Sequence, residues 1–353
     1  MKQDKYVAYA SSYTHNQGKI KSKGIHIFDV NVEDGRITER KEVPINNSSY
    51  VTMSHSENYL YSICDEGVAA YEILSDGDLK YLNTANINGM RGCHISLTSD
   101  DRFMFVSGYH DGKLTVLHVN DDGTVGDIAD EVFHYGMGSI AERNFRPHIS
   151  CAQLTPDEKL VCVCDLGIDQ VKLYNFDKNS GKLHLHDILR IQLESAPRQI
   201  VFSNDGKYAY VLCELKNYID VYKYNPDSKE YFEFIQNIFT VRKNHRSNSA
   251  AAAIRFSMDG EHLFCTNAGD DTLTIYNVDK ETGLLTMSSS LPISGEYPKD
   301  VCVFPDDAHV MSLNHDSNTI TIFTVHYDKG LIVMNGKEIK IGQPNNMVIK
   351  KCE

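Results

Sequence analysis

One pattern recurs seven times along this chain, and it restricts the possible folds more than any other feature. Each copy contains a run of β-branched and aromatic residues, then a polar turn, usually with Asp or Asn and Gly, and then another apolar residue. GIHIFDVNVEDGRI (24–37) and TLTIYNVDKETGLL (272–285) are two of these copies. The equivalent positions, which lie 43 to 57 residues apart, are Phe28, Tyr71, Leu117, Tyr174, Tyr222, Tyr276 and Phe323. Self-similarity at this period is typical of repeat architectures.

Each copy contains enough strand-like runs for four short strands. In the fifth copy the runs are RQIVFS (198–203), YAYVLCE (208–214), YIDVYKY (218–224) and FEFIQNI (232–238). Turn-forming sequences such as SNDGK separate them. Four short antiparallel strands at this period form one blade of a β-propeller, so we predict an all-β fold with seven four-stranded blades in a ring. The alternative, a β-sandwich, does not explain seven matched copies.

The two ends of the chain predict how the ring closes. KYVAYAS (5–11) has the pattern of a second strand, and no first strand precedes it. NNMVIK (345–350) has the pattern of a first strand without partners. We therefore expect the C-terminal strand to complete blade one beside the N-terminal strands, which removes an open sheet edge. The whole chain, 1–353, is predicted to be one domain.

Composition excludes several classes of protein. The net charge is −13 and no basic stripe is visible, which argues against a nucleic-acid partner. The first ten residues, MKQDKYVAYA, lack the apolar core of a secretory signal, and no later run is long enough to span a membrane. Nine cysteines without a C-x-x-C pair indicate reduced thiols in a cytoplasmic protein. The oligomeric state stays open.

The register of the repeat also predicts a site. In each blade, the start of strand one and the end of strand two lie at the same end of the ring, near its axis. Polar side chains therefore converge on one mouth of the central channel, which is the arrangement of a ligand site. The candidates at these positions are His94, His110, His148, Asp165, Arg198, Glu214, Lys299 and His315.

The widest spacing between copies reflects an insertion, FHYGMGSIAERNFRPH (133–148). Its glycines give it flexibility, and Arg143 and Arg146 bring positive charge to the same mouth. A long loop on a repeat scaffold is often a binding loop or lid. An ordinary solvated surface loop is the alternative.

Three segments resemble one known family: GCHISLTSDDRFMFVSGYHDGKLTVLHV (92–119), RPHISCAQLTPDEKLVCVCDLGIDQVKLYNFD (146–177) and APRQIVFSNDGKYAYVLCELKNYIDVYKYN (196–225). They are similar to the propeller lactonases, which include cycloisomerase-type 6-phosphogluconolactonases and carboxymuconate cyclases. The resemblance implies that His148, Arg198 and Glu214 are catalytic. It also shows departures, because Ala268 and Ala253 stand where the family has Arg and Glu.

Opening a lactone requires an activated water and stabilisation of the oxyanion that forms. We expect Glu214 or His148 to act as general base and Arg198 to hold the oxyanion or a substrate carboxylate. A phosphate on the substrate would require further cations, and the register offers Arg143, Arg146 and Lys299. His94, His110, Asp165 and His315 are expected to line the channel and contact the substrate. No metal ion and no cofactor are expected.

Three hypotheses about function follow. The first is a lactone hydrolase that acts on a small anionic sugar lactone, with 6-phosphogluconolactone as the first substrate to test. The second is a non-catalytic propeller that binds a ligand or a protein, which the alanines at 253 and 268 favour. The third is a carboxymuconate-type lactonising cycloisomerase, which would use the same groups in reverse.

Overall fold

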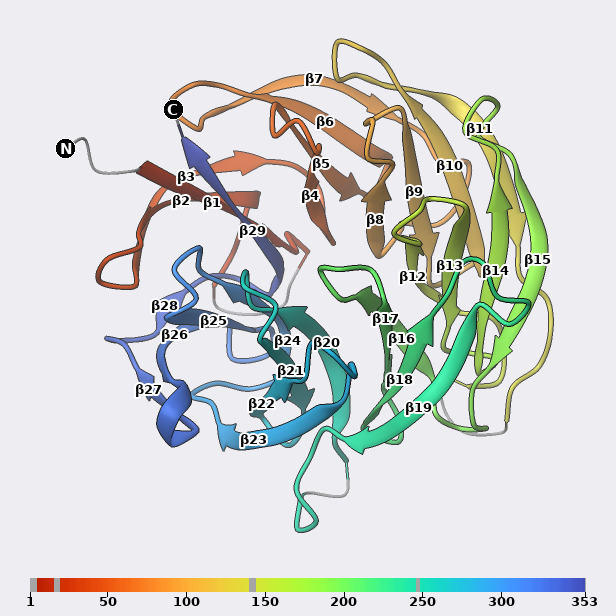
Figure 1. Ribbon diagram of the computed structural model, residues 1–353. Helices are drawn as coiled ribbons and strands as arrows, with labels where there is room; N and C mark the ends of the chain where they lie inside the picture. The colour runs from red at the N-terminus through yellow and green to blue at the C-terminus, as the bar shows by residue number, and fades with distance from the viewer. Residues whose placement is uncertain (1–4, 16–19, 140–143, 246–247, 353) are drawn as a thin grey trace.

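The computed structural model describes residues 5–15, 20–139, 144–245 and 248–352. Seven antiparallel sheets are arranged in a ring around a common axis (Figure 1). Six sheets have four strands and the seventh has an additional short strand, β28, that pairs with β26. The predicted seven-bladed propeller is therefore confirmed.

The blades follow one another in chain order. Blade one contains β29 (Pro344–Cys352), β1 (Lys5–Ser12), β2 (Gly24–Asn31) and β3 (Arg36–Pro44). Blade two contains β4 (Val51–Met53), β5 (Tyr59–Cys64), β6 (Gly67–Ile73) and β7 (Leu79–Ala85). Blade three contains β8 (His94–Leu97), β9 (Phe103–Gly108), β10 (Lys113–Val119) and β11 (Val125–Phe133). Blade four contains β12 (Ile149–Leu154), β13 (Leu160–Asp165), β14 (Gln170–Phe176) and β15 (Leu183–Arg190).

The remaining blades repeat this order. Blade five contains β16 (Pro197–Phe202), β17 (Tyr208–Cys213), β18 (Tyr218–Tyr224) and β19 (Phe232–Phe239). Blade six contains β20 (Ala250–Phe256), β21 (His262–Ala268), β22 (Thr272–Val278) and β23 (Leu285–Pro292). Blade seven contains β24 (Pro298–Val303), β25 (His309–Asn314), β26 (Thr319–His326), β27 (Leu331–Met334) and β28 (Ile339–Lys340), with the 3-10 helix η1 (Tyr327–Lys329) between β26 and β27.

The core lies between the blades. Every residue of β17 is buried, as expected for a strand covered on both faces by neighbouring blades. Tyr210 of blade five and Ile254 and Cys265 of blade six belong to one buried cluster, and similar clusters join the other blades. The outermost strands β15 and β19 are largely exposed or half-buried. All nine cysteines are free thiols, and eight of them are buried.

Blade one is closed by the last strand, as predicted. β29 pairs antiparallel with β1 from Lys5↔Cys352 to Ser12↔Pro344, and Figure 1 shows the two strands side by side. Asn346 of β29 also joins blade one to blade two, because its amide group bonds to both the N–H and the C=O of Val51 at 2.8 Å. Its side-chain oxygen accepts a hydrogen bond of 2.6 Å from Ser11.

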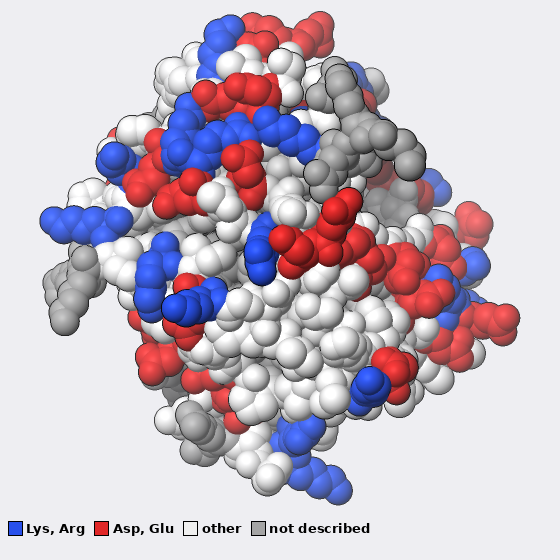
Figure 2. Space-filling model, turned by 90° about the vertical axis from the view of Figure 1, so that its left-hand side faces the viewer, with Lys and Arg blue, Asp and Glu red and all other residues white. Residues whose placement is uncertain are grey.

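The surface is mixed in charge. Figure 2 shows one side of the ring, on which basic side chains lie beside acidic ones rather than in one continuous band. Within the described residues, no helix is long and apolar enough to cross a membrane.

Candidate active site at the mouth of the channel

The predicted register brings some of the candidate residues together in one cavity. His94, Arg198 and Lys299 lie at the starts of β8, β16 and β24, and they line a cavity of about 70 Å³ on the axis. His148 precedes β12, whereas Glu214 and His315 follow β17 and β25 directly. His148 and Glu214 do not line this cavity, but Glu214 contacts Arg198, which does.

Arg198 is the best-placed of the predicted catalytic residues. Its Nη1 donates a hydrogen bond of 2.5 Å to Oε2 of Glu214, and its Nε donates one of 2.6 Å to the carbonyl of Ala252. The Arg198 side chain keeps 25% of its exposure, while Glu214 is only 2% exposed. Burial lowers the pKa of Arg198, but the charge of Glu214 outweighs it and the net pKa is raised. Arg198 is thus a fixed cation that faces the cavity.

The hydrogen bond with Arg198 argues against Glu214 as the general base. One of its carboxylate oxygens is bound to Arg198, and almost none of its surface is open to solvent. A general base must reach the proton that it removes. The geometry therefore favours Glu214 as a positioning residue that orients the guanidinium, rather than as the base.

His148 is held in one tautomer. Its Nδ1 lies 2.6 Å from the carbonyl of Tyr109, so Nδ1 donates and the neutral ring carries its lone pair on Nε2. The ring stacks on Tyr109 with 4.3 Å between the centroids. The backbone N–H of His148 donates to Asp165 at 2.8 Å. These contacts fix the ring as a base requires, although His148 is only 4% exposed.

The starts of blades four and five are joined directly. The hydroxyl of Ser150, two residues after His148, donates a hydrogen bond of 2.7 Å to the carbonyl of Arg198. Ser150 also lines the cavity. Although 50 positions separate His148 from Arg198 in the sequence, the fold thus places their strands next to each other.

Sequence reasoning predicted Lys299 at the mouth but missed Arg91, which lies against the same aromatic ring. The guanidinium carbon of Arg91 and the Nζ of Lys299 each lie 4.8 Å from the ring centroid of Tyr13. Arg91 is paired with Asp65 at 2.7 Å, and Lys299 donates a hydrogen bond of 2.6 Å to Asn345. The sequence signal for Arg91 was its place three residues before His94, in the loop that enters blade three.

Burial, together with the positive charge at this mouth, lowers the pKa of Lys299 and of His315. Burial and the nearby Arg198 lower the pKa of Lys299 to about 8. Burial and Lys299 lower the pKa of His315 to about 4, so His315 is neutral at physiological pH. The ring of His315 packs edge-on against Tyr13, and its Nδ1 donates to the carbonyl of Pro344 at 3.2 Å. The mouth thus gathers cationic side chains although the protein as a whole is acidic.

The other predicted residues differ in position. His110 is exposed, and its pKa is lowered by burial and then by Arg91. Arg146 is exposed and donates to the carbonyl of His110 at 2.9 Å. Arg143 lies outside the described residues. His94 lines the cavity, with its ring 4.8 Å from that of Tyr50.

Asp165, predicted to bind substrate, does not reach the cavity. It is 0% exposed. Its oxygens accept hydrogen bonds from the N–H groups of His148 and Gly167, and Oδ2 lies 2.7 Å from Nδ1 of His134. The carboxylate therefore holds the loop before β12 in place, and this geometry does not support a substrate contact.

The two alanines that depart from the family pattern have different surroundings. Ala268 is buried at the end of β21, whereas Ala253 lines the cavity. Two residues further along β20, Arg255 also lines the cavity. Its Nη2 lies 3.3 Å from both Asp300 and the hydroxyl of Tyr50. Blade six thus still supplies a cation to the channel, but one with its own counter-ion.

The channel continues below this site. A second cavity of about 210 Å³ is lined by the next residues of the innermost strands. The residues that line both cavities are Tyr50, His94, Cys151, Gln199 and Arg255. These five residues lie where the two cavities adjoin.

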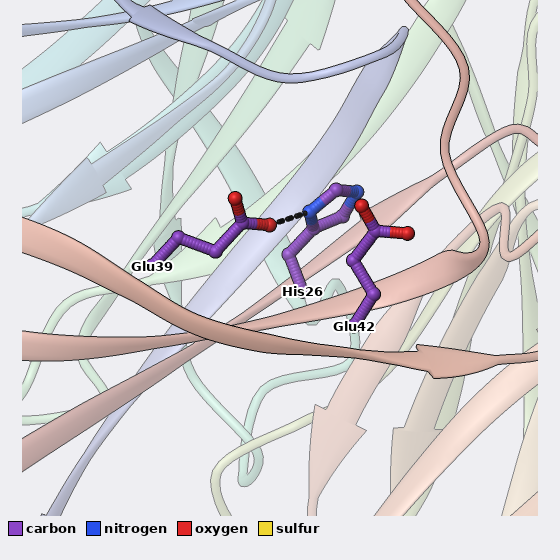
Figure 3. A group of neighbouring side chains, drawn as sticks. All are labelled: His26, Glu39 and Glu42. Atoms are coloured by element: carbon purple, nitrogen blue, oxygen red, sulfur yellow. Dashed lines mark hydrogen bonds and ion pairs between the residues drawn. The ribbon is translucent and has the colours of Figure 1, made fainter.

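One group elsewhere has the composition of a metal site. Among the described residues, His26, Glu39 and Glu42 are a trio whose ligand atoms lie within 4.8 Å of one another (Figure 3). Nδ1 of His26 lies 2.6 Å from Glu39, and Nε2 lies 2.7 Å from the hydroxyl of Ser22. Both ring nitrogens are thus engaged, and the trio joins β2, β3 and the segment before β2 as a structural network.

The fold places the protein in the class of seven-bladed propellers, and Arg198, Arg255 and Lys299 line one of its cavities. The comparisons identify the family. The protein-family model described as "Lactonase, 7-bladed beta-propeller" matches residues 7–349 of this chain. The chain belongs to this family.

Relatives of known structure or name support the assignment. A 6-phosphogluconolactonase of Bacillus subtilis is 33% identical over 309 residues, which cover 86% of each protein. A solved structure from Lactobacillus plantarum is 27% identical, with a TM-score of 0.88 over 99% of this chain and 100% of that one. The periplasmic gluconolactonase of Pseudomonas aeruginosa shares the fold, with a TM-score of 0.92 at 22% identity over 99% of this chain and 100% of that one.

Proposed function

We propose that this protein hydrolyses a small anionic sugar lactone, and that 6-phosphogluconolactone is the first substrate to test. One observation carries the proposal: Arg198, fixed by Glu214, faces an axial cavity that it shares with Lys299. An acidic protein that gathers cations in one pocket is suited to an anionic ligand. The name of the Bacillus subtilis relative supports the choice of lactone.

In the proposed reaction, a substrate carbonyl enters the cavity and Arg198 stabilises the oxyanion that develops on it. Water attacks the carbonyl carbon, and its proton passes to Nε2 of His148; because His148 does not line the cavity, this transfer would run through one further water. The tetrahedral intermediate then collapses, the bond to the ring oxygen breaks, and the imidazolium returns its proton to the leaving alkoxide. One water is consumed and one hydroxy acid is formed.

The size of the cavity determines how the substrate would lie. A cavity of about 70 Å³ corresponds to roughly two waters at about 30 Å³ each, so it can take the reacting carbonyl but not a whole sugar. The rest of the substrate would lie over the rim. There Arg91, together with Lys299 at the cavity wall, would bind a phosphate; both cations lie against the ring of Tyr13. Arg146 would be a further cation.

The test is an assay of 6-phosphogluconolactone and of unphosphorylated gluconolactone, each corrected for spontaneous opening. We expect the wild type to exceed the background and to prefer the phosphorylated substrate. His148→Gln and Arg198→Ala should abolish most of the activity. His184→Gln, on the exposed strand β15, is the matched control and should leave it unchanged. A wild type no faster than background would refute the proposal.

A second candidate function is a non-catalytic, ligand-binding propeller. The binding of Glu214 by Arg198 favours it, because it leaves this carboxylate unsuited to act as a base. In that case the product, 6-phosphogluconate, should bind to the mouth although no lactone is hydrolysed. A lactonising cycloisomerase, the third hypothesis, has no observation of its own here. A cytoplasmic location and the absence of a nucleic-acid partner stay predictions from the sequence.

A further inference from the structure

Cys151 occupies a special position in the channel. It lies on β12, the innermost strand of blade four, and lines both the upper and the lower cavity. Of the nine cysteines, Cys93 lines only the upper cavity, and the remaining seven are not in the walls of these two cavities. The Cys151 thiol is therefore part of the wall of both cavities.

A histidine from the neighbouring blade lies against this thiol. Nε2 of His94 is 3.8 Å from Sγ of Cys151. Nδ1 of His94 has no hydrogen-bond partner, although the residue is only 9% exposed and lines both cavities. An unpaired nitrogen buried in this way is costly unless a ligand, water or proton occupies it. Cys151 and His94 together have the composition of a thiol–imidazole pair.

A second thiol lies directly across the sheet. Cys151 of β12 and Cys164 of β13 are opposite partners in the antiparallel register. Directly opposite residues in such a pair have Cα atoms about 4.5–5.5 Å apart, and disulfides form at Cα separations of about 4.4–6.8 Å. Hydrogen bonding from Cys164, and then the charge of His94, lower the pKa of Cys151 against the effect of burial.

We propose that Cys151 is a site of oxidation by small hydroperoxides that enter the axial channel, with Cys164 as the resolving thiol. The Cys151 thiolate attacks one peroxide oxygen, the O–O bond breaks, and sulfenic acid and water or an alcohol are formed. Cys164 then attacks the sulfenic sulfur, a second water leaves, and a Cys151–Cys164 disulfide results. The peroxide is reduced by two electrons and the two thiols are oxidised by two.

The other cysteines provide the contrast that makes the proposal specific. Cys93 is more exposed than Cys151, but burial raises its pKa to about 12, and its thiol donates to the carbonyl of Ile149 at 3.4 Å. Cys162 lies in the same buried cluster as Cys151 and Cys164, and burial raises its pKa. Reactivity should therefore follow thiolate character and channel access rather than exposure alone.

The experiment is to treat the folded protein with millimolar hydrogen peroxide, block the remaining thiols, and map the peptides by mass spectrometry without reduction. We expect a Cys151–Cys164 disulfide to be the first product. In Cys164→Ser, the sulfenic acid at Cys151 should persist and be trapped by dimedone. Cys162→Ser is the matched control and should give the wild-type disulfide. His94→Gln should slow the oxidation several-fold.

Two results would overturn the proposal. One is oxidation of Cys93 ahead of Cys151 in the wild-type protein. The other is a wild type in which Cys151 stays reduced while the unfolded protein is oxidised. Both are read in the unsubstituted chain, so they do not depend on whether Cys151→Ser folds. They are also independent of the lactonase assay, which leaves the two proposals separately testable.

Discussion

Lys299 allows the electrostatics of the mouth to be tested by pH alone. Its pKa is lowered to about 8, first by burial and then by Arg198. Lysine is normally protonated up to about pH 10.4. The ammonium group should therefore lose its charge between pH 7 and pH 9, where an ordinary surface lysine keeps it.

The expected change in ligand affinity follows from the pKa of Lys299. With a pKa of about 8, the protonated fraction falls from about nine-tenths at pH 7 to about one-tenth at pH 9. If only the ammonium form holds the phosphate, the affinity for an anionic ligand weakens about tenfold over this range. The second pKa of a phosphate monoester is about 6, so the ligand itself does not titrate in this window.

The assay is calorimetric titration of 6-phosphogluconate, which is stable at alkaline pH, with gluconate as the ligand that lacks phosphate. We expect the Kd for 6-phosphogluconate to rise from pH 7 to pH 9 in the wild type. Lys299→Arg should bind with little pH dependence, because arginine stays charged. Lys299→Met should bind weakly at every pH.

A flat wild-type profile would refute this account of Lys299. So would the same slope in Lys299→Met, since another group would then titrate. The direction of this pKa shift also predicts how Lys299 affects the stability of the fold. A lowered lysine pKa means that the charged form is disfavoured in the folded protein, so Lys299 opposes folding below about pH 8 and this cost disappears as the pH rises towards the unfolded value.

Four further predictions concern the site, the ring and the domain organisation. Arg198→Ala should lower kcat/KM by about 10²–10³-fold, as the loss of one oxyanion donor does elsewhere, with initial rates as the readout. Glu214→Gln should keep the shape of the site but lower kcat, and should destabilise the fold by about 3–5 kcal/mol if the ion pair behaves as a buried one; an unchanged denaturation midpoint would contradict this. Deleting 343–353 exposes the edge of β1 and should remove most of a typical stability of about 5–15 kcal/mol. A truncated protein with wild-type thermal unfolding would argue against closure by β29. If the whole chain is one domain, the intact protein should unfold in a single transition.

The fold could be predicted because the repeat provides the same information seven times. Each copy fixes the register of the next, so the predicted positions of Arg198 and Lys299 at strand starts, and of Glu214 at a strand end, follow from alignment alone. The same alignment predicted that residues 345–350 close blade one. Period and register are backbone properties, and the sequence encodes them directly.

The contacts of the site could be predicted only in part. Arg91 lies in a connecting loop, where the repeat carries no signal, and its place beside Tyr13 depends on side-chain directions across two blades. Asp165 has the predicted register, but its carboxylate turns away from the channel to bind backbone N–H groups. At the end of a strand, a side chain can point into the channel or away from it. The direction depends on local hydrogen bonds, which the periodicity of the sequence does not describe.

The closure of blade one has a consequence for how the protein is made. Tyr13 follows β1, whereas Asn345, which holds Lys299, belongs to β29. The cationic mouth thus depends on residues beside the first and the last of the described strands. A chain in which β29 has not yet formed lacks Asn345 and the last strand of blade one, so ligand binding should appear only once β29 is in place, and products that end before β29 should be inert.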